Sequence, residues 1–173
     1  MKIIIFGSGG VGGYFGGRLA AIGEDVYFIA RGAHLDALRG TGLYLTSPLG
    51  DAHVEQVQAT DTVADCGVAD VVLVAVKLYD TAAAADSIRP AVGPDTTIVS
   101  FQNGVSGADI LSDAFGREHV IGGTSSIAAR IEKPGTIEQT GKMATLAFGE
   151  WDGADSPRTQ RLLDACLKAG IDA

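Results

Sequence analysis

The chain has 173 residues, an apolar fraction of 46% and a charged fraction of 20%, which together exclude a disordered or fibrous protein. Asp and Glu outnumber Lys and Arg by 21 to 13, and the net charge of -8 argues against a nucleic-acid partner because the average field repels a polyanion. The first apolar run stops at Gly7 and no later run approaches membrane-spanning length, so we expect no secretory signal, no membrane partner and a cytoplasmic location.

Four runs of β-branched and other apolar residues predict strands buried on both faces, at residues 3–6, 26–30, 71–76 and 97–101. Helical spacing over residues 11–22, an alanine-rich segment at 81–89 and a segment at 106–115 predict helices among them. This alternation indicates the α/β class, with a Rossmann-like doubly wound parallel sheet.

The remaining segments are less regular. Residues 41–59 predict a small hairpin around the turn at 48–50, and strands are expected near 119–130, 135–141 and 144–149. A last helix begins at Pro157, with Ser156 as its N-cap, and ends at Gly170. We therefore expect the second half of the sheet to be irregular.

Two cysteines, Cys66 and Cys166, are too few for a disulfide scaffold and lack metal-ligand spacing. This usage suits a reducing compartment. We interpret both as packing residues and expect no metal site.

A G-x-G-x-x-G motif follows the first predicted strand and opens the first predicted helix; it consists of Gly7, Ser8, Gly9, Gly10, Val11 and Gly12. In that context the first glycine permits a tight turn, the second lets a pyrophosphate approach the backbone, and the third lets the helix pack closely on the sheet. The helix N-terminus then directs free N–H groups at the anion. Dinucleotide binding is the working hypothesis, and a glycine-rich turn that binds nothing is the alternative.

The residue at the end of the second predicted strand distinguishes a site for NAD from a site for NADP. Enzymes that use NAD place a carboxylate there, whereas no carboxylate lies between Asp25 and Asp36 and Arg31 occupies the position. A guanidinium can bind a 2′-phosphate, so NADPH is favoured over NADH unless Arg31 only faces solvent. His34 either adds a contact to the same phosphate or is a surface histidine at the start of a helix.

Polar residues directly after buried strands are candidates for a ligand cleft. Lys77 follows the third strand, and Asn103 follows the fourth; the alternatives are a solvated strand end for Lys77 and a turn residue for Asn103. The small residues of segment 124–130 would let a ring lie against the backbone, if that segment is not a plain strand. No general acid for carbonyl reduction is identifiable from spacing.

In this order, the segments resemble the ketopantoate reductase (2-dehydropantoate 2-reductase) family over essentially the whole chain. The matching residues are 1–3 leading into the glycine motif, 30–31, 74–77, 102–105 and 123–130. The resemblance implies NADPH-dependent reduction of a small-molecule substrate, 2-dehydropantoate, to pantoate, on the route to pantothenate and coenzyme A. By position, it implies cofactor contacts (NADPH/NADP+) from Gly7–Gly12, Arg31, Lys77, Asn103 and Ala129, with Lys77 and Asn103 supporting the nicotinamide end.

Family members also have a helical C-terminal domain, entered soon after the point where this chain ends, that carries the catalytic lysine and the substrate-binding residues. The resemblance therefore implies that residues 1–173 are a NADP-binding Rossmann-like domain with no catalytic residue of its own, and that this chain alone is inactive. A homodimer is possible through the apolar face that such a domain exposes. Two alternatives stay open: a reductase or dehydrogenase acting on another 2-oxo or 3-hydroxy acid, and a non-catalytic NADPH-binding module.

Overall fold

The computed structural model describes all 173 residues and contains one nine-stranded sheet with five α-helices. The strands, in the order β4-β3-β9-β8-β7-β6-β1-β2-β5 across the sheet, are β1 (Lys2–Phe6), β2 (Asp25–Ile29), β3 (Leu43–Thr46), β4 (Ala52–Val54), β5 (Gln58–Thr60), β6 (Val71–Val74), β7 (Thr97–Ser100), β8 (Val120–Lys133) and β9 (Thr136–Gly149). The helices are α1 (Gly10–Ala21), α2 (Gly32–Thr41), α3 (Thr81–Ile88), α4 (Ser106–Phe115) and α5 (Pro157–Lys168).

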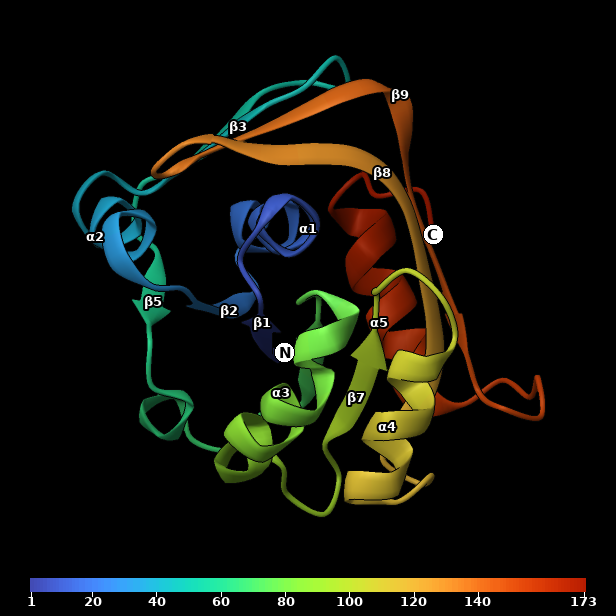
Figure 1. Cartoon of the computed structure of the whole chain (residues 1–173). Helices are drawn as coiled ribbons and strands as arrows, with labels where there is room; N and C mark the ends of the chain where they lie inside the picture. Colours follow the sequence, from blue (N-terminus) through green and yellow to red (C-terminus); the bar gives the residue numbers. More distant parts are fainter.

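The half of the sheet from β5 to β8 is parallel, as the alternation of strands and helices predicts. Its central strands β1, β6 and β7 are buried on both faces, and two separate apolar cores cover them. Helix α1 lies over one face, while α3 and α4 lie over the other (Figure 1). The chain order reverses between β1 and β6, so the switch point of this doubly wound sheet lies at the end of β1.

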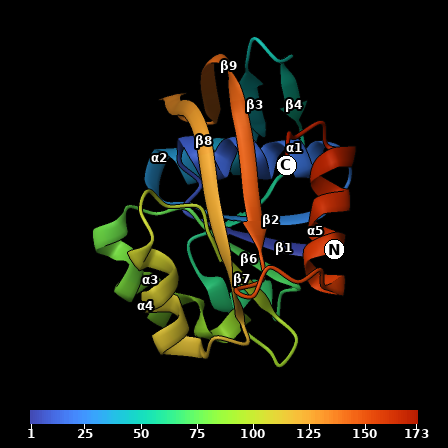
Figure 2. The ribbon, with the colours of Figure 1, turned by 90° about the vertical axis from the view of Figure 1, so that its right-hand side faces the viewer.

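The other half of the sheet turns across α1. Strands β8 and β9 form a long antiparallel pair, and Figure 2 shows them crossing in front of α1, with β1 and β2 below α1 in this view. The segments 135–141 and 144–149, predicted as separate strands, are one strand, because an irregularity in the pairing near Ala128 absorbs the extra residues.

The predicted hairpin at 41–59 is confirmed only in part. Strands β3 and β4 pair antiparallel, and β3 then joins β9. Residues Gln58–Thr60 leave the hairpin and pair with β2 at the opposite edge of the sheet. The hairpin therefore extends the β8–β9 half, and β5 completes the parallel half.

The glycines of α1 fit the helix between these two halves. A Cβ at Gly16 would crowd Ile5 and Phe28 of the parallel half, and one at Gly17 would crowd Leu43 and Leu45 of β3. These glycines therefore let α1 pack closely against both halves of the sheet.

Helices α3, α4 and α5 agree closely with the sequence predictions. Helix α4 has the predicted bounds, and α5 begins at Pro157 with a capping box made by Ser156 and Thr159. Cys66 and Cys166 are both buried and unpaired, as packing residues are, and burial raises the pKa of Cys166 to about 12. None of the helices combines the length and the apolar character needed to cross a bilayer.

Candidate functional site

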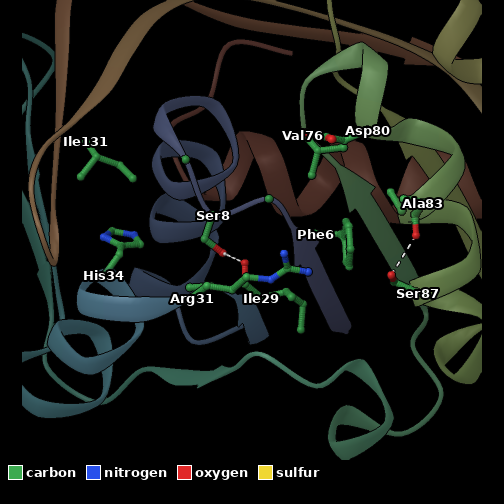
Figure 3. A pocket seen from close by; sticks show the side chains of 14 residues that line it. Phe6, Ser8, Ile29, Arg31, His34, Val76, Asp80, Ala83, Ser87 and Ile131 are labelled. Carbon is green, nitrogen blue, oxygen red and sulfur yellow. Dashed lines mark hydrogen bonds between the residues drawn. The ribbon is translucent and has the colours of Figure 1, made fainter.

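Two cavities flank the glycine-rich turn at the carboxyl ends of the parallel strands. One has a volume of about 380 Å³ and extends past the end of β2 (Figure 3). The other has a volume of about 400 Å³ and extends past the ends of β6 and β7. Gly7, Gly9, Val76 and Asp80 line both cavities, so the turn lies between two halves of one cleft. The cleft coincides with the switch point of the sheet.

The protein's own packing accounts for three of the four glycines in the turn. Gly7 has a φ of 103°, which favours glycine, and a Cβ at this position would lie 2.8 Å from the Val76 nitrogen. A Cβ at Gly12 would overlap the Gly7 carbonyl, and one at Gly10 would overlap the Ala129 carbonyl of β8. Gly9 differs, because a Cβ there would meet nothing within 4 Å.

The start of α1 is open to an anion. Gly9 is its N-cap and no side chain caps the first turn, which also contains no acidic residue. The first N–H groups of the helix thus have no side-chain partner, and the helix dipole favours negative charge there. Ser8 is buried, and its hydroxyl donates to the Ile29 carbonyl at 2.9 Å, which fastens the turn to β2. Val11, in the same turn, lines the second cavity.

Arg31 directly precedes α2 and lines the first cavity. The side chain is exposed and takes part in no salt bridge. In Figure 3 it runs beneath Ser8 toward Ile29. Its charge is therefore available to a ligand in this cavity.

His34 lines the first cavity together with Arg31, so its contact with the same phosphate stays a prediction. It lies in the first turn of α2, but its side chain is partly buried and lies beside Ile131, away from the Arg31 guanidinium (Figure 3). Its Nδ1 accepts a hydrogen bond from the Gly135 N–H at 3.1 Å, and its Nε2 is enclosed without a hydrogen-bond partner. Burial lowers the pKa of His34 and outweighs the opposing effect of the Ser8 backbone. It is a neutral connection between α2 and the β8–β9 turn.

The second cavity brings together the remaining predicted residues. Lys77 and Asn103 are exposed and line it from the loops after β6 and β7. Ala129 lines it from β8, together with Ser125 and Ile127, because alternate residues of that strand face the cavity. Segment 124–130 is thus both a strand and one wall of the cleft.

Sequence reasoning did not identify Asp80, which lines both cavities. The sequence does contain a signal for this residue, because Asp80 lies three residues after Lys77 and directly before the predicted helix at 81–89. The structure contains no cluster of three or more His, Cys, Asp and Glu side chains that could hold a metal ion.

The fold, with its switch point and cleft beside a glycine-rich turn, defines a Rossmann-like α/β domain. Residues 3–153 match the family model described as ketopantoate reductase PanE/ApbA, and the chain therefore belongs to the ketopantoate reductase family, as the resemblance implied. This is a family of oxidoreductases.

Named relatives agree with this assignment. The 2-dehydropantoate 2-reductase of Pyrococcus abyssi is 38% identical, with 99% of this chain and 55% of that protein covered. The uncharacterized oxidoreductase YkpB of Bacillus subtilis is 35% identical, over 95% of this chain and 54% of that protein. The solved structure of the 2-dehydropantoate 2-reductase of Porphyromonas gingivalis W83 is 34% identical with a TM-score of 0.93, over 99% of this chain and 62% of that one. The chain spans a little over half the length of these relatives.

Proposed function

We propose that residues 1–173 are the NADP-binding domain of a longer enzyme that reduces 2-dehydropantoate to pantoate with NADPH. The pyrophosphate of the cofactor would lie at the turn formed by Gly7–Gly12, between the two cavities. The adenosine would enter the cavity beside Arg31, and the nicotinamide would enter the cavity beside Lys77, Asn103 and Ala129. The assignment of substrate rests on the family and on relatives of that name.

Gly9 is the observation that carries the proposal. The backbone there has a φ of -77°, which any residue can adopt, and a side chain would meet no protein atom within 4 Å. Packing and backbone conformation therefore do not require glycine at this position. A ligand close to the backbone would require it, and Gly9 lies where the two cavities meet.

Bound NADPH would supply a hydride to the C2 carbonyl of the substrate. The residues of this chain would bind and orient the cofactor: Lys77 offers three N–H donors, and Asn103 both donates and accepts at the same end of the cleft. The family resemblance assigns the proton donor for the developing alkoxide to the helical domain. We therefore expect this chain by itself to bind NADPH without turnover.

The Arg31→Ala variant tests the assignment of the 2′-phosphate. Removing a charge-assisted hydrogen bond costs about 1.5–3 kcal/mol, so NADPH affinity should fall by roughly 10- to 100-fold, while NADH affinity changes little. Isothermal titration of both nucleotides measures this. Arg39→Ala is a matched control, because Arg39 lies on α2, the helix that Arg31 precedes, and its side chain donates to the Ala59 carbonyl instead. Equal losses for the two nucleotides would contradict the assignment.

A second function is a reductase of the same kind acting on another 2-oxo or 3-hydroxy acid. This second function is supported by the 35% identity to an oxidoreductase that is described as uncharacterized. The longer enzyme, assayed for NADPH oxidation against 2-dehydropantoate and a panel of other 2-oxo acids, distinguishes the two: a preference for another acid by kcat/KM would support this second function.

A further inference from the structure

Gln102 is a buried polar side chain between two loops of the cleft. It is 6% exposed, directly precedes Asn103, and lies in the loop after β7. Its carboxamide reaches the loop after β6, where Lys77 is located. Gln102 is among the residues that line the second cavity, but both polar atoms of its carboxamide are bonded to other groups of the protein.

The hydrogen bonds of Gln102 form one consistent chain. Its Nε2 donates to the Val76 carbonyl at 2.9 Å and to the Thr81 hydroxyl at 2.8 Å, and its Oε1 accepts from the Ser100 hydroxyl at 3.0 Å. The Thr81 hydroxyl donates in turn to the Leu78 carbonyl at 2.7 Å. A carbonyl only accepts, so the bond to Val76 determines which end of the amide is the nitrogen.

These bonds hold the backbone on both sides of Lys77. Val76 and Leu78 are its two neighbours, and the carbonyl of each is bonded to Gln102 or to Thr81. Thr81 and Ser100 are themselves buried, so the chain of bonds is shielded from competing water. The carboxamide of Gln102 thus determines how Lys77 lies relative to Asn103, which directly follows Gln102 in the chain.

Helix α4 leaves space for this carboxamide. Gly107, in its first turn, is buried, and a Cβ there would overlap the Gln102 Oε1 and lie 2.9 Å from the Ser100 hydroxyl. Any larger residue at this position would displace the amide. The surrounding packing is therefore shaped around this amide.

We propose that Gln102 is a positioning residue, which holds Lys77 and Asn103 at the spacing that the nicotinamide end of the cofactor requires. The inference rests on the proposed function for the identity of the ligand. Gln102 is buried and acts through its neighbours.

The test replaces Gln102 with Met, which keeps the length of the side chain and removes its donors. Binding of NADPH is compared with binding of 2′-phospho-ADP-ribose, which has the same adenosine, phosphates and second ribose but no nicotinamide. We expect Gln102→Met to weaken NADPH binding about tenfold more than binding of the nicotinamide-free compound. Hydrogen exchange at the amides of residues 77–81 should also become faster.

Gln139→Met is the matched control. Gln139 is another buried glutamine, and its amide bonds the carbonyls of Thr140, Gly141 and Met143 on β9 instead. Its loss should lower the melting temperature without changing the ratio of the two affinities. If Gln102→Met does not fold, Thr81→Val removes the next link of the same chain of bonds, and Thr81→Ser restores its hydroxyl.

The two failures are distinguishable. If the unmodified chain binds neither nucleotide, the proposed function is wrong and this inference with it. If the unmodified chain binds both, and the ratio of affinities is unchanged in Gln102→Met or in Thr81→Val, the inference alone is overturned. A changed ratio in the variant that folds, with an unchanged ratio in Gln139→Met, supports it.

Discussion

At the scale of single residues, glycines that look equivalent in the motif have different physical causes. Gly10 is glycine because the Ala129 carbonyl of β8 lies against it, whereas Gly9 faces open space. Only the first cause is visible in the protein alone. The second points to a bound ligand, and the two can be separated by substitution.

Gly10→Ala should destabilise the domain by about 1–3 kcal/mol, the usual cost of inserting a methyl group where there is no space. Gly9→Ala should change the free energy of unfolding by no more than a neutral surface substitution does, about 0.5 kcal/mol. The same variant should bind NADPH roughly tenfold or more weakly. Thermal melts and titration calorimetry measure the two effects. A Gly9→Ala variant that binds NADPH normally would contradict a pyrophosphate at this position.

At the scale of elements, α5 attaches to the sheet at its N-terminal end. The Ser156 hydroxyl accepts from the Thr159 N–H and donates to Glu150, and the two Glu150 oxygens each bond the Arg158 guanidinium at 2.6 Å. The Arg158 hydrogen bonds hold the pKa of Glu150 below its ordinary value. Leu162, in the middle of the helix, is buried in the core that also contains Leu146 of β9.

Ser156→Ala should lower the stability of the domain by about 1 kcal/mol, because it removes the cap of α5. For a domain of this size, that corresponds to a fall of roughly 2–4 °C in Tm. Differential scanning calorimetry measures it, with Ser156→Thr as the variant that keeps the hydroxyl. A Ser156→Ala melting temperature equal to that of the unmodified chain would show that the cap contributes nothing.

At the scale of the whole molecule, the two halves of the sheet enclose α1, and His34 is one of their connections. It lies on α2 and accepts from Gly135, which is 101 residues away in the β8–β9 turn. A proton on Nδ1 would face the Gly135 N–H, so the folded chain favours the neutral ring. The lowered pKa of His34 also favours the neutral ring.

This connection makes stability depend on pH. The stabilisation from His34 is complete above the ordinary histidine pKa of 6.5, and is lost as the pH falls from there toward the lowered pKa of the folded state. Thermal melts between pH 5 and about 8, compared with those of His34→Gln, which keeps an acceptor but does not titrate, isolate the effect. Parallel pH profiles for the two proteins would contradict it.

Much of the site could be predicted from the sequence because strand ends and helix starts are local features. The glycine motif, Arg31, Lys77 and Asn103 each follow a strand that short-range patterning predicts, and parallel strands bring their carboxyl ends to one edge. The role of Gln102 could not be predicted, because its partners Val76 and Thr81 belong to a segment more than 20 residues earlier in the chain.

The sequence by itself determined the α/β class, the parallel half of the sheet and the place of the cleft, since hydrophobic periodicity and turn residues act over a few positions. Only the tertiary structure decided that β8 and β9 turn across α1, that Gly16 and Gly17 face the sheet, and that His34 bonds Gly135. The physical reason is that these contacts join residues far apart in the chain, and close packing between elements, unlike periodicity, has no local pattern.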